Sequence, residues 1–284
     1  MNKVILSGID FSDCSINALE HAISIANRAA ADICMVWVNR PANDKEIYKV
    51  DPANITGEVV RRFEQLVARY QPSLLGSKLS YQIRKGKIYE EIVRVANELD
   101  AFLIIIGTHG SSGFEEFWIG SNANRIVSAT DRPVITIRGG VDISRSIKII
   151  VMPIDNTIES RQKVPMTALL AKYFGAEIHI LALFSADVED IKETVREYVN
   201  QVKIYLAENQ VDFKVIEIIA DNLTDSTIEY AIRVNANLIS IMDEQEITTA
   251  NLWLGPYAQQ MVNHSPVPVL SIHAKDFTMG GSSM

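Results

Sequence analysis

The central segment of the first half of the chain reads Ala101-Phe-Leu-Ile-Ile-Ile106, followed at once by Gly107-Thr-His-Gly110-Ser-Ser-Gly-Phe-Glu-Glu-Phe-Trp-Ile-Gly120-Ser121. The six apolar residues predict a strand that is buried on both faces of a sheet. The residues after the loop, 122–128, predict a helix. Glycines let a backbone approach an anion closely, and the free N–H groups of a helix N-terminus supply positive potential. A buried strand, a glycine loop and a helix in this order indicate a phosphate site in an α/β protein.

Composition and charge exclude several classes of protein. The longest apolar run, 101–106, is far shorter than the roughly 18 residues of a membrane span, so we expect no membrane contact. The first residues lead into a strand without the apolar core of a signal peptide, which predicts a cytoplasmic protein. Residues 1–140 carry 16 basic and 16 acidic residues, and residues 141–284 carry 11 and 19. Neither half shows the basic stripe of a nucleic-acid binder, so we expect no nucleic acid as a partner.

The chain contains an internal sequence repeat of two copies. Lys3-Val-Ile-Leu-Ser-Gly-Ile-Asp10 recurs as Lys148-Ile-Ile-Val-Met-Pro-Ile-Asp155, an offset of 145 residues. Arg132-Pro-Val-Ile-Thr-Ile137 recurs as Val267-Pro-Val-Leu-Ser-Ile272, an offset of 135. The second copy therefore lacks about ten residues, which we assign to the loop around Pro41–Ile55 of the first copy. We expect a first domain at 1–140, a second at 141–275 and a tail at 276–284 without periodicity.

Strands alternate with helix-length segments in both copies. In the first copy we expect strands at 3–10, 32–39, 78–85, 101–107 and 133–138, and helices at 13–30, 56–70, 87–99, 120–130. In the second we expect strands at 147–154, 176–184, 211–219, 237–242 and 267–273, and helices at 158–174, 188–208, 222–235, 250–263. Such alternation predicts right-handed crossovers and an open parallel sheet with helices on both faces. Ligands bind such sheets at the carboxyl ends of the strands, where the crossovers diverge. In the first copy those ends carry Asp10 and the Gly107 loop.

The glycine spacing, Gly-x2-Gly-x9-Gly-Ser, resembles the nucleotide-binding signature of the universal stress protein family. With the repeat, the whole chain apart from the tail looks like a tandem universal stress protein. The resemblance implies two tandem Rossmann-like, open, parallel five-stranded sheets with strand order 3-2-1-4-5, the adenine nucleotide alpha hydrolase-like fold. It implies ATP or AMP as ligand in the first domain and a role as a nucleotide-dependent stress regulator. The residues that it places around the nucleotide are Gly8, Ile9, Asp10, Val38, Ile106, Gly107, His109, Gly110, Gly120, Ser121 and Asn122.

The expected roles of these residues follow their chemistry. Val38 would meet the adenine through its backbone, and Asp10 would accept a hydrogen bond from the ribose or from water around a metal. Asp10 alternatively caps the first helix, and both roles are compatible. Any Mg²⁺ would be held by phosphate oxygens and water, because the motif offers no carboxylate cluster and no protein metal site. His109 lacks a local carboxylate to orient it as a base, so we identify no catalytic residue and expect at most a slow ATPase.

The second copy departs from the signature. Gly107 is replaced by Met242, Gly110 by Gln245 and Ser121 by Pro256, and only Gly255 persists, opposite Gly120. The segment 242–246 also carries three carboxylates, which would repel a triphosphate. We therefore expect no ATP in the second copy.

Two functions remain open at this stage. The chain is a nucleotide-dependent regulator, or it is an adaptor whose acidic second copy binds a partner while any nucleotide is incidental. The resemblance also implies that the last strands of the two copies pair antiparallel as a pseudo-dimer within the chain, and it allows a further homodimer.

Overall fold

The computed structural model describes residues 2–39, 55–108, 121–139, 146–184, 188–219, 222–243, 245–248 and 251–274. The side chains of Ser121, of residues 245–248 and of residues 251–253 are not described. The predicted tail and most of the glycine loop lie outside these ranges. We use "first half" for residues 1–140 and "second half" for residues 141–284.

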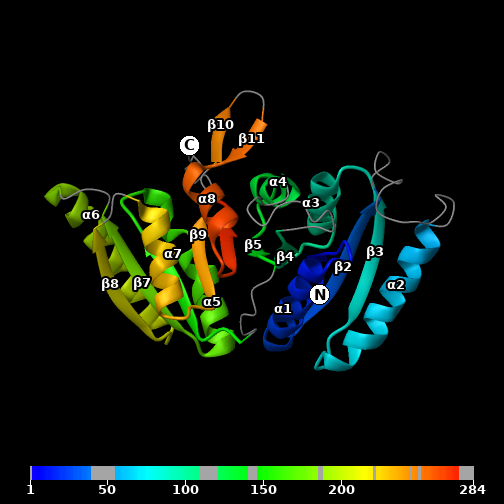
Figure 1. Cartoon of the computed structure of the whole chain (residues 1–284). Helices are drawn as coiled ribbons and strands as arrows, with labels where there is room; N and C mark the ends of the chain where they lie inside the picture. The colour runs from blue at the N-terminus through cyan, green and yellow to red at the C-terminus, as the bar shows by residue number, and fades with distance from the viewer. Residues whose placement is uncertain are drawn as a thin grey trace, which may run out of the picture.

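Each half alternates strands and helices in the predicted order (Figure 1). The first half contains β1 (Lys3–Gly8), α1 (Asp13–Ala29), β2 (Ala31–Asn39), α2 (Ile55–Tyr70), the 3₁₀ helix η2 (Gln71–Ser73), β3 (Leu79–Lys85), α3 (Ile88–Glu98), β4 (Leu103–Gly107), α4 (Ser121–Ala129) and β5 (Val134–Ile137). The second half contains β6 (Ile149–Ile154), the 3₁₀ helix η3 (Ile158–Arg161), α5 (Val164–Phe174), β7 (Glu177–Phe184), α6 (Glu189–Glu208), β8 (Phe213–Ile219), α7 (Leu223–Arg233), β9 (Leu238–Met242), β10 (Gln245–Thr248), β11 (Asn251–Leu254), α8 (Pro256–His264) and β12 (Val269–Ile272).

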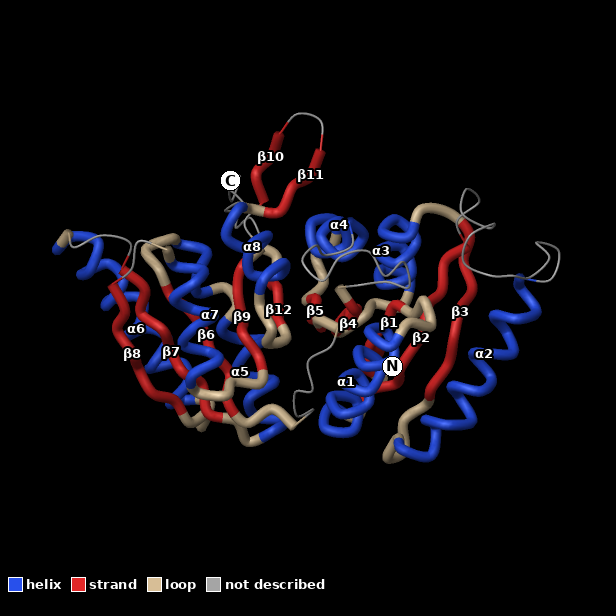
Figure 2. The backbone as a smooth tube through the Cα atoms, in the orientation of Figure 1, coloured by secondary structure: helices blue, strands red, loops and turns tan. Residues whose placement is uncertain are grey.

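The strand order is β3-β2-β1-β4-β5 in the first half and β8-β7-β6-β9-β12 in the second, which confirms the predicted order 3-2-1-4-5. Among the five strands that each half contributes to this sheet, all pairs are parallel. The two halves join where β12 pairs antiparallel with β5, with Leu270 opposite Ile135, so that ten strands form one continuous sheet (Figure 2). This is the pairing of last strands that the resemblance implied within one chain.

Helices cover both faces of this sheet. Alternate residues of a strand point to opposite faces, and on β1 Ile5 contacts the core beneath α1, α2, α5 and α6 while Leu6 contacts the core beneath α3, α4, α7 and α8. The crossovers that leave β1 and β4 therefore run to opposite faces. Their divergence leaves a crevice at the carboxyl ends of these two strands.

Two predicted helices of the second half begin later than expected. The segment 158–174 forms η3 and then α5, because Pro165 lacks the N–H that a continuous helix would use and sits instead in the first turn of α5. The segment 250–263 is helical only from Pro256, after Gly255. Before it, β10 and β11 form an antiparallel hairpin, which the sequence analysis missed. The β-branched residues Ile247 and Thr248 favour a strand there.

Across the described ranges, no helix is both long enough and apolar enough to span a bilayer.

Candidate functional site

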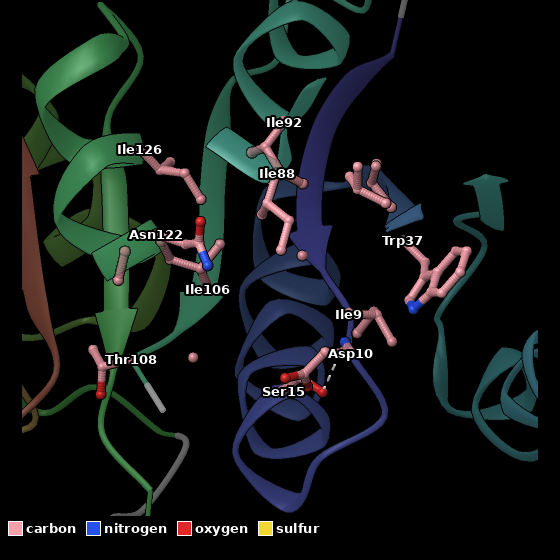
Figure 3. A pocket seen from close by; sticks show the side chains of 15 residues that line it. Ile9, Asp10, Ser15, Trp37, Ile88, Ile92, Ile106, Thr108, Asn122 and Ile126 are labelled. Atoms are coloured by element: carbon pink, nitrogen blue, oxygen red, sulfur yellow. Dashed lines mark hydrogen bonds between the residues drawn. The ribbon is translucent and has the colours of Figure 1, made fainter. Parts of the chain in front are cut away.

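A cavity of about 140 Å³ lies at the carboxyl ends of β1, β2 and β4 (Figure 3). It therefore occupies the crevice that the crossover rule predicts. The predicted residues that line it are Gly8, Ile9, Asp10, Val38, Ile106, Gly107 and Asn122. They come from four separate elements or their ends. The fold alone brings them together.

Val38 presents its backbone to this cavity. Backbone groups of a parallel strand face its two neighbours alternately. Ile9 N–H donates to the carbonyl of Val36 at 2.9 Å, so Val36 faces β1, and Val38, two residues later, faces the same side. The pairing of β1 with β2 ends at Gly8 and Val36, whereas β2 pairs with β3 as far as Asn39. One N–H donor and one carbonyl acceptor of Val38 thus face the cavity, a pattern that matches the edge of a heterocyclic base.

Asp10 shapes the turn that leads from β1 into α1. Its Oδ1 accepts hydrogen bonds from Ser12 N–H at 3.0 Å and from Ser12 Oγ at 2.6 Å. Ser12 is the N-cap of α1, since its side chain accepts from Ser15 N–H. Asp10 N–H donates to Ser15 Oγ at 3.3 Å (Figure 3). Asp10 therefore orients the capping residue instead of capping the helix itself, and Asp10 is also one of the residues that line the cavity.

Gly107 is required by packing as well as by the site. A Cβ atom added to Gly107 would lie 2.7 Å from Sγ of Cys14 and 3.1 Å from the backbone carbonyl carbon and oxygen of that residue. Cys14 is buried in the first turn of α1, where its thiol donates to the carbonyl of Ile137 at 3.4 Å. Glycine at this position lets β4 end directly against the start of α1. This close approach brings the ends of β1 and β4 together around the cavity.

The predicted phosphate end is described only in part. Asn122 and Ala123, in the first turn of α4, line the cavity, so this helix begins at the cavity, and a helix N-terminus favours an anion. Ser121 is the first residue of α4. His109, Gly110 and Gly120 lie outside the described residues, and their contacts remain predictions.

The Usp family model, described as the universal stress protein family, matches residues 1–138. The first half of the chain belongs to the universal stress protein family. Universal stress protein MJ0531 of Methanocaldococcus jannaschii is 27% identical over 139 residues, which are 48% of this chain and 82% of that protein. Universal stress protein YxiE of Bacillus subtilis is 26% identical over 153 residues, 48% of this chain and 99% of that protein.

The fold of the whole chain also has a counterpart. The crystal structure of a universal stress protein from Archaeoglobus fulgidus superposes with a TM-score of 0.74, covering 95% of this chain and 98% of that one. At 16% identity this similarity shows the fold alone. Both halves of this chain therefore share their fold with that structure.

Sequence reasoning missed most of the cavity wall. The residues that were not predicted are mostly apolar, and two of them, Ser15 and Thr108, carry hydroxyl groups. The full set is Ser15, Val36, Trp37, Ile88, Ile92, Thr108, Ala123 and Ile126. Amphipathic patterns identify the buried face of each helix, but they do not show which buried residues border a crevice. Trp37, next to Val38, is the one informative signal, because an aromatic residue at the end of a buried strand is well placed to contact a ligand.

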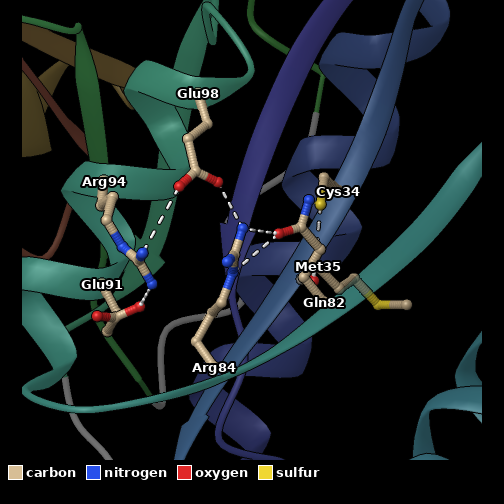
Figure 4. A network of polar contacts seen from close by, with 7 residues as sticks. All are labelled: Cys34, Met35, Gln82, Arg84, Glu91, Arg94 and Glu98. Carbon is tan, nitrogen blue, oxygen red and sulfur yellow. Dashed lines mark hydrogen bonds and ion pairs between the residues drawn. The ribbon is translucent and has the colours of Figure 1, made fainter.

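Helix α3, which contributes Ile88 and Ile92 to the wall, is held on the edge strand β3 by a polar network (Figure 4). Arg84 of β3 donates to Glu98 of α3 at 2.5 Å and to Gln82. Arg94 pairs with Glu91 one turn earlier on α3. Arg94 and Glu98 are exposed and Arg84 and Glu91 are half-buried, so each pair remains in contact with solvent and contributes little stability, at most about 1 kcal/mol. The network also places charges along an open sheet edge, which discourages pairing with another chain.

The equivalent slot of the second half is filled by its own side chains. Only about 10 Å³ remains at the ends of β6 and β9, roughly the space of one water molecule. Pro153 stands where the first half has Gly8, Met242 where it has Gly107, and Tyr257 where it has Asn122. Each replacement adds volume that projects into the slot. Lys163, which is 2% exposed, also lines it and donates to the carbonyl of Ser160.

Two acidic residues, Asp155 in this slot and Asp243 next to Met242, make hydrogen bonds or ion pairs within the second half. Asp155 repeats the turn of Asp10, because its Oδ1 accepts from Thr157 N–H at 2.8 Å and from Thr157 Oγ1 at 2.5 Å. Asp243, one of the three carboxylates expected to repel a phosphate, is buried and lies 3.1 Å from Nδ1 of His273. Burial raises the pKa of Asp243. Asp243 is paired with His273, and the repulsion expected from it stays a prediction; the small volume of the slot shows that side chains fill it.

Among the described residues no group of three or more His, Cys, Asp or Glu side chains is arranged to hold a metal ion. Mg²⁺ bound through phosphate oxygens remains a prediction.

Proposed function

We propose that the first half binds an adenine nucleotide, ATP or AMP, and that occupancy of this site regulates the protein in a stress response. The observation that carries the proposal is the convergence of three features on one cavity. These features are a backbone donor and acceptor at Val38, a carboxylate at Asp10 and the N-terminus of α4. Their chemistry suits the base, the ribose and the phosphates of a nucleotide, respectively.

We further propose that each chain binds one nucleotide. The second half keeps the turn of the first, since Asp155 repeats Asp10, but its slot has a volume of about 10 Å³ against about 140 Å³. The fold supports two sites, and the side chains of the second half close one of them.

The matched pair Asp10→Asn and Asp155→Asn tests this proposal. An asparagine retains the side-chain oxygen that accepts from Ser12 or Thr157, so both turns persist. At Asp10 the substitution replaces the charged carboxylate that would accept a hydrogen bond from the ribose. A hydrogen bond to a charged group contributes about 1.5–3 kcal/mol. We expect Asp10→Asn to weaken ATP and AMP binding about tenfold or more, and Asp155→Asn to leave it within about twofold.

Titration calorimetry measures both the affinity and the number of nucleotides bound per chain. Two nucleotides per chain, or an equal effect of the two substitutions, would contradict the assignment of a single site. Absence of binding by the unmodified chain at millimolar ATP and AMP would refute the nucleotide function altogether.

An adaptor function is the alternative, favoured by the excess of 19 acidic over 11 basic residues in the second half. Hydrogen exchange of residues 106–125 separates the two functions. A regulator requires protection of this segment to change when ATP binds, and unchanged protection at millimolar ATP favours the adaptor.

A further inference from the structure

The segment of the second half that aligns with the glycine loop contains a β-hairpin. Residues 242–256 correspond to residues 107–121 of the first half. Within this segment, β10 and β11 form a hairpin that stands beside α4 of the first half (Figure 1). β11 packs against α4. A segment of the second half thus supports the helix that begins at the nucleotide cavity of the first.

Helix α4 has one side on the cavity and another on the second half. Asn122, Ala123 and Ile126 line the cavity. Asn124, on the adjoining side of the helix, donates from its side-chain amide to Oδ1 of Asn263 in α8 at 3.2 Å. The helix has only nine residues, so its orientation depends on its packing partners more than on its own stability.

Leu254, at the end of β11, lies in the apolar core that joins the cavity side of α4 to the second half. Its side chain is 6% exposed and belongs to the same apolar cluster as Ala123 and Ile126 of the cavity wall. The same cluster includes Met261 and Val262 of α8. A continuous set of close-packed side chains therefore runs from the cavity wall into the second half, and close-packed interiors transmit displacements.

We infer that Leu254 and Asn263 are positioning residues for the nucleotide site: they hold α4 from behind, so the second half sets the affinity of the first for its ligand. This inference rests on the proposed nucleotide function. Leu254→Ala removes the packing behind α4 without altering any residue of the cavity. Since the helix N-terminus must point at the phosphates, a shift of α4 weakens binding.

The test measures ATP affinity of the full chain by titration calorimetry for Leu254→Ala, Leu254→Met, Asn263→Ala and Leu206→Ala. Leu206 is fully buried on α6, on the opposite face of the sheet from α4, and provides a matched loss of a buried leucine in the second half. We expect Leu254→Ala to weaken ATP binding about fivefold or more, within the usual range of coupling between sites. Asn263→Ala should act in the same direction, while Leu254→Met, which conserves volume, and Leu206→Ala should stay within about twofold.

Hydrogen exchange of residues 121–129 provides a second readout. Leu254→Ala should reduce protection of α4, whereas Leu206→Ala should not. Unchanged ATP affinity in both Leu254→Ala and Asn263→Ala would overturn the inference, and so would an equal loss in Leu206→Ala, which would indicate general destabilisation. If the unmodified chain binds no ATP, the proposed nucleotide function fails. If the unmodified chain binds ATP and the variants bind it equally well, only the positioning role of Leu254 and Asn263 fails.

Discussion

Gly107→Ala tests whether the end of β4 must touch the start of α1. The added methyl would lie 2.7 Å from Sγ of Cys14, closer than carbon and sulfur atoms approach without displacement, and 3.1 Å from the Cys14 carbonyl group. The backbone of α1 cannot yield as a flexible side chain does. Overpacking of this kind costs about 1–3 kcal/mol, so we expect the free energy of unfolding to fall by that amount.

Gly139→Ala is the matched control, because it places a methyl beside the same cysteine at an ordinary distance. Its Cβ would lie 3.5 Å from both Cβ and Sγ of Cys14. The two glycines thus differ by 0.8 Å in their approach to one sulfur atom. Gly139→Ala should change the free energy of unfolding by no more than about 0.5 kcal/mol, the usual range for a substitution without a clash.

A double-mutant cycle with Cys14→Ala identifies the cause. Removing the sulfur relieves the shortest contact, so Gly107→Ala should cost less in the Cys14→Ala background, by about 1 kcal/mol or more. Urea unfolding of the four proteins supplies the free energies, with equal m-values as the check that the unfolding transition is unchanged. The reasoning would be refuted if Gly107→Ala were as stable as the unmodified chain, or if the two substitutions were simply additive.

Two further predictions concern acid stability and the phosphate bed. Burial lowers the pKa of His179, whose Nε2 lies 2.8 Å from Glu177 and whose Nδ1 lies 3.0 Å from the hydroxyl of Tyr230. The unfolded chain therefore takes up the proton more readily, so the stabilising effect should be full above about pH 6.5 and be lost as the pH falls below it. Between pH 7.5 and 5.5 the midpoint of urea unfolding should fall less in His179→Gln than in the unmodified chain. An equal fall of the midpoint in both proteins would contradict this prediction. Gly110→Asp should abolish ATP binding in calorimetry while leaving the circular dichroism spectrum and unfolding midpoint unchanged, because it adds an anion where the phosphates are expected.

Much of the fold follows from patterns that the sequence displays openly. Apolar runs such as 101–106, separated by helix-length segments and repeated at offsets of 145 and 135 residues, lead to two parallel five-stranded units. The crossover rule then places Asp10 and Gly107 at one crevice, as observed. Predictions of this kind succeed because the spacing of apolar residues and the length of each strand or helix depend on residues that are close together in the chain.

The sequence did not reveal the β10–β11 hairpin. Residues 245–254 are aligned with a loop and precede a helix, so a helix beginning near residue 250 was the natural expectation. The hairpin depends on its packing against α4, a partner more than 100 residues away in the chain. No local pattern contains that contact.

The sequence by itself determined the repeat and the alternation of strands and helices, and it predicts a phosphate-binding loop at 107–121, because each of these depends on residues close together in the chain. Only the tertiary structure decided what the second half does. Pro153, Met242 and Tyr257 are ordinary core residues when read one at a time, and they fill a slot only because two strands and a helix, β6, β9 and α8, bring them to one point. Likewise, Asp155 looks like a ligand residue in the alignment, and its hydrogen bonds to Thr157 show it to be part of a turn. Steric filling and packing at a distance are properties of three-dimensional neighbours, which a linear alignment does not record.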